Sequence, residues 1–440
     1  MDLTVLSTSL CDYLPYLFSV TLGVIFGTIS GLLPGVGHLL ALTLSSPFLI
    51  KLTALEIFLF YLVMVQVSQF LGSLTTIFTQ IPGETSSMPI VIETQRLSSS
   101  RLHDAVSSTA IGSFFGMLIA ILISLFFLDL ITYSSYIYRT EVIFVLFSLA
   151  MITMFYIGQD PFIIKILMLF IGSALGLVGY NLNLETNILT FDRIELTAGI
   201  PTILVLMCVF AIPQLWKLRD FSLLHKLNHI RFATSWKSMQ MIPISSLLGF
   251  FGGLMPGLAT IFSSQTAYTW AKWRTKDPVL RITASETANN AGAVSQMIPM
   301  LILGLPIVNS EALTLSLMEA RGYVAGIGSG ISYMTQGIIP LLIGSTAAII
   351  IAWPLCLYTI RLLSVKMYLV RIIIIGILCL TVLWEAYYNM QLIFYLICFF
   401  ALITLGWYLK KYDTMILVFA FFISERWLDY AIRMITFYIK

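Results

Sequence analysis

Long apolar runs recur along nearly the whole chain, and they restrict its fold more than any other feature. A membrane-spanning helix needs about 20 mainly apolar residues. Runs of this kind lie near 14–33, 38–50, 55–79, 106–131, 142–157, 161–180, 196–216, 241–270, 287–308, 331–358, 367–384, 391–409 and 413–424. Several are too short or too interrupted for a plain span. We therefore expect an all-α polytopic membrane protein with about 10 to 13 transmembrane or re-entrant helices.

The composition agrees with a membrane protein and argues against several soluble classes. Hydrophobic residues make up 59% of the chain and charged residues only 10%, whereas soluble proteins carry about 25% charged residues. The net charge of +3 gives no reason to expect a nucleic-acid partner. The cysteines form no Cys-x-x-Cys pair, the histidines are scattered, and no Walker A sequence is present. We expect no metal site, no other cofactor and no enzymatic activity.

Helix-breaking residues recur in two stretches, in the same order and at nearly the same spacing. The segment GTISGLLPG (27–35) matches GFFGGLMPG (249–257), which begins 222 residues later. The segment TQIPGETSS (79–87) matches LGLPIVNSE (303–311), and their prolines lie 224 residues apart. Two punctuated stretches at one spacing indicate that each half of the chain is a copy of one unit.

The repeat and the basic residues together predict the domains and the topology. We expect a first transmembrane repeat at 1–216, a basic linker at 217–240 and a second repeat at 241–440. Cytoplasmic loops collect Lys and Arg, so the linker and the segment AKWRTKDPVLR (271–281) are placed in the cytoplasm. The N-terminus then lies outside a multi-pass protein of the inner (cell) membrane. The copies are expected to be inverted, as in many secondary transporters, and two parallel bundles are the alternative.

The breaks have a chemical consequence as well as a topological one. Proline lacks an amide hydrogen and glycine tolerates unusual backbone angles, so together they unwind a helix. Unwound backbone within a membrane must face protein or a water-filled cavity. Amides at the start of a half-helix attract an anion, and free carbonyls attract Na⁺ or a proton carrier. We expect one substrate site enclosed by Pro34 and Gly35, Pro82 and Gly83, Pro256 and Gly257, and Gly304 and Pro306. Close helix packing is the alternative interpretation of the glycines.

Polar residues beside the breaks extend this candidate site. The further candidates for substrate binding are Gly37, Thr85, Ser86, Ser87, Asn309 and Ser310. Hydroxyls there donate to a substrate carboxylate or, alternatively, cap the next helix. Glu84 is expected to hold a coupling cation or proton rather than an anion. His38 is a candidate for ion coupling because imidazole titrates near neutral pH, and a packed histidine is the alternative.

The segment SETANNAG (285–292) carries the most concentrated polar chemistry. Glu286, Asn289 and Asn290 open an apolar run, and their spacing of three and four residues places them on one helix face. A carboxylate and two amides inside a membrane are costly and indicate function. Asparagine can bind Na⁺ or a carboxylate, and Glu286 can carry a proton. A polar cap at the start of the helix is the alternative.

At these residues the chain resembles the large membrane subunit of tripartite tricarboxylate transporters. The matching stretches are GLLPGVG, GSLTTIFTQIPGETSS, GGLMPG and SETANNAGAVSQMIPMLILGLP. The last is the most specific, since the family carries Glu-x-x-Asn-Asn-Ala followed by Ile-Pro and a Leu-Gly-Ile-Pro-Gly-like turn. The order and spacing of the motifs are similar to the family over about 20–325.

The resemblance implies an inverted-repeat secondary carrier that imports small carboxylates, such as citrate-like acids, with a Na⁺ or H⁺ gradient. It implies two partners, a small membrane subunit and an extracytoplasmic solute-binding protein; a homodimer is a further hypothesis. It also implies that the site is lined by Pro34, Gly35, Pro82, Gly83, Ser86, Ser87, Pro256, Gly257, Glu286, Asn289, Asn290, Gly304 and Pro306.

The chain departs from the family pattern at several of these motifs. His38 stands where the family usually has the final proline of Pro-Gly-x-Gly-Pro, and Ile307 stands where glycine is usual. A family Asp-Gly corresponds to Glu93 and Thr94. These departures indicate a divergent member.

Three classes of function are compatible with parts of this pattern. The leading hypothesis is a gradient-driven carrier of small organic anions that works by alternating access. The alternative is a translocase for a lipid-linked phosphate or other anionic headgroup, which would use the same breaks. A non-transporting membrane scaffold is the third class, and it has no need for paired breaks that carry Glu286 and two asparagines.

Overall fold

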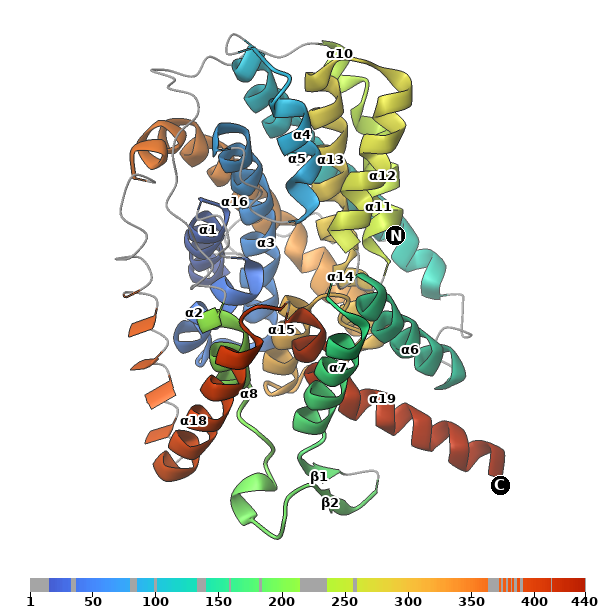
Figure 1. Ribbon diagram of the computed structural model, residues 1–440. Coiled ribbons are helices and arrows are strands. Elements are labelled where there is room, and N and C mark those ends of the chain that lie inside the picture. Colours follow the sequence, from blue (N-terminus) through green and yellow to red (C-terminus); the bar gives the residue numbers. More distant parts are fainter. Residues whose placement is uncertain are drawn as a thin grey trace. The chain divides into compact units, whose positions relative to one another are not determined.

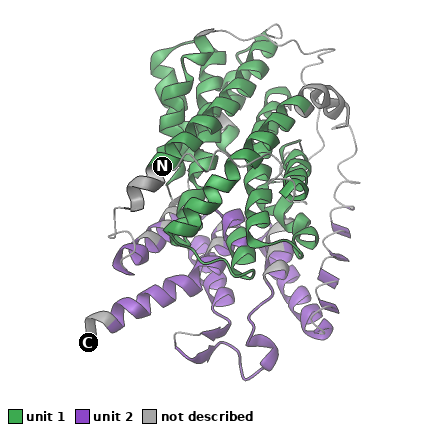
Figure 2. Cartoon of the chain, turned by 180° about the vertical axis from the view of Figure 1, so that it is seen from behind, with its two compact units in different colours: residues 1–133, 220–307, 314–366 green, residues 134–219, 308–313, 367–440 purple. Residues whose placement is uncertain are grey.

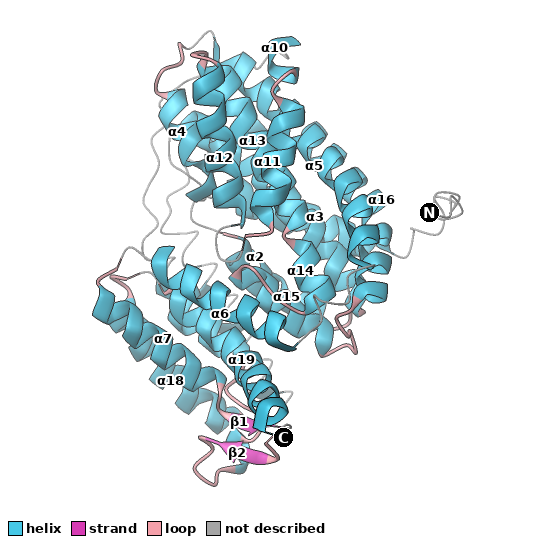
Figure 3. Ribbon diagram, turned by 90° about the vertical axis from the view of Figure 1, so that its right-hand side faces the viewer, coloured by secondary structure: helices cyan, strands magenta, loops and turns pink. Residues whose placement is uncertain are grey.

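The computed structural model confirms an all-α membrane protein (Figure 1). The structure describes residues 16–32, 37–79, 85–98, 101–132, 140–157, 160–181, 184–213, 236–255, 259–362, 391–412 and 414–439, and isolated positions from 372 to 387. Helices make up most of these residues, and the strands form one small hairpin (Figure 3). In this hairpin β1 (Gly179–Asn181) pairs antiparallel with β2 (Thr186–Ile188), with Gly179 opposite Ile188.

The chain divides into two compact units, each built from separated segments (Figure 2). The first unit contains 1–133, 220–307 and 314–366, and the second contains the remaining segments. The division into repeats at 1–216 and 241–440 stays a prediction. Of the predicted linker at 217–240, the structure describes only residues 236–240.

The first unit holds most of the helices that carry the candidate site residues. Its elements are α1 (Leu17–Leu32), α2 (His38–Leu49), α3 (Ala54–Thr79), the 3₁₀ turn η3 (Thr85–Ser87), α4 (Met88–Thr94), α5 (Leu102–Thr132), α10 (Trp236–Met239), α11 (Ile242–Gly253), α12 (Ala259–Arg274), α13 (Pro278–Ser295), α14 (Met297–Leu303) and α16 (Ile327–Leu362). Helix α15 (Asn309–Glu319) begins in the second unit and ends in the first.

The second unit is a smaller set of apolar helices and the hairpin. Its elements besides β1 and β2 are α6 (Thr140–Ile157), α7 (Phe162–Gly176), η6 (Ile194–Leu196), α8 (Thr202–Val205), the π-helical turn η7 (Leu206–Ala211), α18 (Leu392–Leu409) and α19 (Met415–Ile439). Helix α7 packs against α19 at Gly172 and Gly176, where a β-carbon would collide with the backbone of Leu417 and Phe421. The glycine pair therefore serves close packing here.

Most predicted apolar runs form helices, and one of these helices begins earlier than predicted. The run near 241–270, within which a break is predicted, forms two helices: α11 ends at Gly253 and α12 begins at Ala259. The run expected from 287 begins much earlier, at Pro278. Asp277 starts this helix: its side chain accepts a hydrogen bond from the Val279 amide at 3.0 Å, and Pro278 fills the first helical position.

Four of the described helices are long and apolar enough to cross a membrane. They are Ala54–Phe78, Leu102–Phe126, Ile327–Ile350 and Leu392–Leu409. The first of these segments is also almost entirely buried by its neighbours. A spanning helix surrounded by protein rather than lipid can carry polar side chains, and α3 does so.

The glycines of the two repeated motifs make the same kind of contact. Helix α1 lies along α3 in Figure 1, and a β-carbon on Gly27 would lie 2.6 Å from the Met64 carbonyl oxygen. Helix α11 lies along α13, and a β-carbon on Gly249 would lie 2.6 Å from Ala288 Cα. Both glycines allow two helix backbones to approach closely.

One later long helix from each sequence half packs against a helix of the other half. Helix α5 contacts α13, where Gly112 and Gly116 lie against Thr287. Helix α16 contacts α3, where Gly337 lies against Leu62. The first unit is therefore built from helices of both sequence halves. In it a helix from each half packs against a helix from the other half.

Candidate functional site

The SETANNAG segment lies in the middle of α13, surrounded by other helices. Glu286, Asn289 and Asn290 are all buried, with exposed fractions of 0–1%. The helix begins at Pro278, two turns before Glu286. The alternative of a polar cap at the helix start is therefore wrong, because Asp277 performs that role.

Glu286 and Asn290 form one hydrogen-bonded group with α5. Asn290 Nδ2 donates to Glu286 Oε1 at 2.7 Å and lies 3.0 Å from Ser113 Oγ. Ser113 Oγ also lies 3.4 Å from Glu286 Oε1. The i, i+4 spacing on α13 thus places the amide directly on the carboxylate.

A row of polar side chains on α3 completes the group. Asn289 Nδ2 donates to Gln69 Oε1 at 2.7 Å, and Gln66 Nε2 donates to the Asn290 carbonyl oxygen at 3.1 Å. Asn289 Oδ1 is buried and has no hydrogen-bond partner among the described residues. We call the group of Glu286, Asn289, Asn290, Gln66, Gln69 and Ser113 the central polar cluster.

The two glutamines and Ser113 are not among the predicted site residues. A signal for the glutamines exists, since Gln66, Gln69 and Ser73 interrupt an apolar run at spacings of three and four residues. All three are buried. No such pattern singles out Ser113 from the other small residues of α5.

The η3 turn packs against α12, and Ser264 of α12 connects it to the first half of α13 through hydrogen bonds. Ser264 Oγ of α12 donates to the Ser86 carbonyl oxygen at 2.6 Å and lies 2.7 Å from Ser285 Oγ. Ser86 and Ser87 are buried, and Ser86 Oγ has no partner among the described residues. Thr85 begins the turn. The structure therefore brings this predicted segment to the same helix as Glu286.

Three of the four predicted breaks fall largely on residues that the structure does not describe. These residues are Pro34, Gly35, Pro82, Gly83, Glu84, Pro256 and Gly257. The helices before them end at Leu32, Thr79 and Gly253. Gly37 precedes α2 in an extended conformation, and the half-buried His38 is the first residue of that helix.

The fourth predicted break is present. Helix α14 ends at Leu303, and Gly304 adopts the left-handed conformation with φ +63°. Pro306 follows in a non-helical stretch, and α15 begins at Asn309. Glu311 Oε2 accepts from the Val308 amide at 3.4 Å, as in a helix cap. Asn309 and Ser310 are buried and belong to the second unit.

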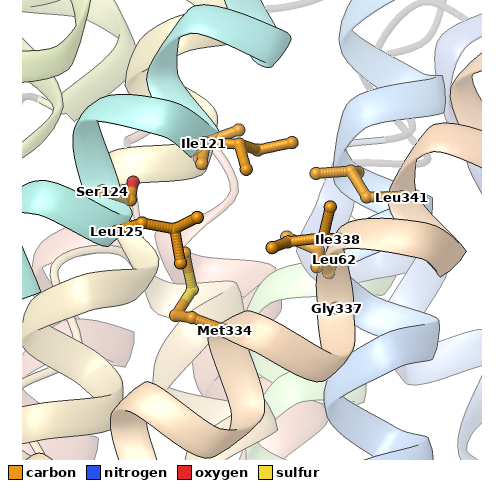
Figure 4. A pocket seen from close by; sticks show the side chains of 9 residues that line it. Leu62, Ile121, Ser124, Leu125, Met334, Gly337, Ile338 and Leu341 are labelled. Atoms are coloured by element: carbon orange, nitrogen blue, oxygen red, sulfur yellow. The ribbon is translucent and has the colours of Figure 1, made fainter. Parts of the chain in front are cut away.

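Two small cavities lie among α3, α5, α13 and α16. One adjoins the central polar cluster at Gln66, Ser113 and Asn290 and has a volume of about 10 Å³. The other, also about 10 Å³, is apolar and includes Leu62 and Met334 (Figure 4). Each has room for roughly one water molecule. Neither can hold a citrate-sized molecule unless the helices move apart.

A buried ion pair lies nearer the start of α13. Glu93 Oε1, on α4, accepts from Arg281 Nη1 at 3.0 Å and from Tyr268 Oη at 2.8 Å. Arg96 also reaches this oxygen, at 3.3 Å, from a largely exposed position. Arg281, which the sequence places in a cytoplasmic loop, is instead a buried residue of α13, because the helix starts earlier than predicted.

A second ion pair near this end is partly exposed. Arg101 Nη2 lies 3.0 Å from Asp277 Oδ2, and both side chains keep about a third or more of their surface exposed. The hydrogen bond that Arg101 donates to Asp277 raises the pKa of the Arg101 guanidinium. Exposed pairs of this kind contribute little to stability, so we treat it as a surface contact.

The chemistry of the central polar cluster suits a small cation or a proton. It combines one carboxylate with amide and hydroxyl oxygens, and oxygen ligands of this kind suit hard cations such as Na⁺. Among the described residues no group of three or more His, Cys, Asp or Glu side chains is placed to bind a metal ion. The free oxygen of Asn289 points to an unfilled acceptor position within this cluster.

Comparisons with known proteins agree with the motifs. Residues 17–420 match the Tripartite tricarboxylate transporter TctA family. The chain is 24% identical over 361 residues to an uncharacterised 52.8 kDa protein of the TAR-I ttuC′ 3′ region of Agrobacterium vitis, covering 78% of this chain and 72% of that protein. No solved structure matches the chain.

Proposed function

Because the chain belongs to the tripartite tricarboxylate transporter TctA family, we propose that it imports small di- and tricarboxylates through the inner membrane by alternating access. The family is a transporter family, and membership implies a small membrane subunit and an extracytoplasmic binding protein as partners. The proposal adds the substrate class, the coupling and the transport cycle to that assignment.

The observation that carries this proposal is the central polar cluster itself. A carboxylate and four amides are buried together in the first unit, among helices that include three apolar ones of spanning length. Such groups are costly within a membrane and persist where an ion or a substrate uses them. A scaffold of the same helices would be more stable with apolar residues at these positions.

Glu286 is assigned the coupling role in this scheme. Its carboxylate takes up a proton or joins Asn289 Oδ1 as a ligand of Na⁺, and either event neutralises the buried charge. This neutralisation directly affects Asn290, because the Asn290 amide donates a hydrogen bond to Glu286 Oε1. Binding of the coupling ion therefore alters the hydrogen bonds that join α13 to α5.

The cycle requires the helices around the cluster to separate. The cavities beside the cluster have volumes of only about 10 Å³, so the described arrangement is closed around it. Residues near the four breaks are where the chain is expected to bend, since glycine absorbs changes in backbone angle. Opening toward one side and then the other constitutes alternating access.

Uptake into proteoliposomes tests this function. The full chain, reconstituted with its partner subunits, is expected to accumulate labelled citrate or succinate only under an imposed Na⁺ or pH gradient. Glu286→Gln and Asn290→Ala are expected to lower gradient-driven uptake by at least about 100-fold, through the loss of the coupling group. Gln336→Ala, which removes an amide of α16 outside the cluster, is the matched control and should transport normally.

Two outcomes contradict the proposal. Normal transport by both cluster variants would show that the site is elsewhere. Lack of carboxylate uptake by correctly inserted wild-type protein, with translocation of a lipid-linked phosphate instead, would favour the translocase hypothesis.

The inverted topology is a separate part of the proposal. The N-terminus is assigned to the outside and the linker 217–240 to the cytoplasm, because basic residues collect there. Single cysteines at positions 185 and 410 are expected to react from opposite sides of the membrane. Labelling of both from the same side would contradict the inverted arrangement.

A further inference from the structure

A positively charged side chain close to the substrate strengthens the binding of a carboxylate, and the central polar cluster contains none. Its one ionisable group is Glu286, which repels an anion when it is charged. Among the Lys and Arg side chains whose burial the structure describes, Arg281 is the one that is buried. The compensating charge is therefore to be sought at Arg281.

Arg281 already holds a carboxylate in this structure. Its Nη1 donates to Glu93 Oε1 at 3.0 Å, and its Nε donates to the Thr275 carbonyl oxygen at 3.0 Å. The second contact fixes the guanidinium at the end of its side chain. The geometry is that of an anion-binding arginine, occupied by a side chain of the protein.

Only one of the two carboxylate oxygens of Glu93 accepts hydrogen bonds from the described residues. Tyr268, Arg281 and Arg96 all donate to its Oε1, whereas its Oε2 is buried and has no hydrogen-bond partner among the described residues. A carboxylate that accepts hydrogen bonds through only one of its two oxygens is bound less strongly than one that accepts through both. A free carboxylate that contacts the same donors with both oxygens can compete with it.

Arg281 is linked to the central polar cluster along one face of α13. Arg281, Ser285 and Asn289 follow one another at intervals of four residues, which aligns them along the helix. Ser285 contacts Ser264, and Asn289 contacts Gln69. A polar side chain thus recurs at about every turn of this face from the arginine to the cluster, over about 12 Å of helix.

We propose that Arg281 binds a carboxylate group of the transported anion and that Glu93 occupies this position when no substrate is bound. The proposal rests on the carboxylate-carrier function above and names a substrate-binding residue for it. Tyr268 serves both states, because its hydroxyl donates to Glu93 or to the incoming carboxylate. Substrate binding releases Glu93, and with it α4, from α12 and α13.

This exchange and a purely structural ion pair predict different effects of two mutations on the affinity for substrate. If Glu93 competes with substrate, Glu93→Gln frees Arg281 and strengthens binding. Arg281→Gln removes the cation and weakens binding. A pair that only supports the fold gives losses of binding or stability in both variants.

Equilibrium binding of labelled citrate and succinate to the full chain, purified with its partner subunits, tests this. We expect Glu93→Gln to lower the dissociation constant by about 10-fold, the gain for a site that is otherwise free about one tenth of the time. We expect Arg281→Gln to raise it by about 10- to 100-fold, as for loss of a charge-assisted hydrogen bond. Arg281→Lys keeps the charge without the planar guanidinium, so a smaller rise of about 3- to 10-fold is expected.

Arg101→Gln is the matched control, because it removes an arginine from the partly exposed pair with Asp277. Its dissociation constant should equal that of the wild type. Changes of the same sign in Glu93→Gln and Arg281→Gln would overturn the proposal, as would unchanged binding in Arg281→Gln. If Arg281→Gln does not fold, unchanged binding in both Glu93→Gln and Arg281→Lys would overturn it equally.

The failure of this proposal is separable from failure of the transport function. Carboxylate uptake by wild-type protein, with normal affinity in Arg281→Gln, would leave the function standing and remove the role of Arg281. Absence of citrate and succinate binding by the wild type would overturn both.

Discussion

Helices α3 and α13 occupy equivalent places in the two halves, yet they differ in charge. The glycine helix α1 packs on α3 as α11 packs on α13. At the spacing of 224 residues, Gln66 corresponds to Asn290 and the two are hydrogen-bonded to each other. At the same spacing Leu62 corresponds to Glu286. The packing is repeated, but the carboxylate is present in one copy only.

This difference shows how two helices with similar packing can carry a single buried carboxylate between them. Equivalent residues such as Gln66 and Asn290 meet where the two copies approach each other. An exact repeat would bury a second carboxylate at position 62, beside apolar residues such as Val294 and Met334, where a charged group has no partner. Leucine at position 62 instead lines an apolar cavity, and Glu286 is the one carboxylate of the two equivalent positions.

The largest expected effect comes from making the two copies alike. Leu62→Glu puts a second carboxylate into the apolar cavity of Figure 4, where Leu62 is 2% exposed. The buried group must stay charged without a partner or shift its protonation, at a cost of about 4 kcal/mol or more. We expect loss of folded protein in detergent, measured by size-exclusion chromatography after heating. Leu62→Met is the control, and normal stability of the glutamate variant would contradict the comparison.

The next effect tests whether the packing is equivalent in both copies. Gly27→Ala and Gly249→Ala each add a β-carbon that meets the backbone of α3 or α13. Overpacking of this kind costs about 1–3 kcal/mol, so both melting temperatures should fall. Gly37→Ala is the control, because no described atom lies within 4 Å of the position that its β-carbon would take. A loss in one copy alone would show that the repeat is not structural.

A smaller effect measures the polar contact between α3 and α13. A double-mutant cycle of Gln69→Ala and Asn289→Ala, followed by reversible unfolding in SDS, is expected to give a coupling of about 1 kcal/mol. Their hydrogen bond at 2.7 Å is buried, which supports a measurable value. A coupling near zero would mean that the two amides act independently.

The smallest loss of stability is expected from a neutral hydrogen bond between α1 and α3. Ser68 Oγ donates to Ser30 Oγ at 2.9 Å between α1 and α3. Ser68→Ala removes a neutral pair without leaving a charge, so a loss of about 0.5 kcal/mol is expected in the same SDS assay. A loss larger than that of Asn289→Ala would reverse the ranking of the two copies.

The repeated motifs and the helical class are readable from the sequence because they depend on local signals. Proline and glycine mark helix ends, and apolar runs mark helices, without reference to distant residues. The sequence places the start of α13 too late, because the basic segment around this start is typical of a loop. In the structure the helix begins at Pro278. Asp277 followed by Pro278 is a helix-start signal that corrects this prediction.

The partners of the site residues are beyond reach of the sequence. Gln69 and Asn289 are 220 residues apart, and Glu93 and Arg281 are 188 apart. Neither pair follows from periodicity, since only the packing of α3, α4 and α13 brings them together. Arg281 in particular has the sequence context of a loop residue, and only its buried acceptor distinguishes it.

The exchange of helices between halves constrains how the protein is made. Thr132 ends α5, and its packing partner α13 begins at Pro278. A ribosome that adds roughly 5–20 residues per second leaves α5 waiting about 7 to 30 seconds for that partner. During this interval the groove at Gly112 and Gly116 faces lipid or the insertion machinery. Biogenesis of the first half is therefore completed only when the second half has been synthesised.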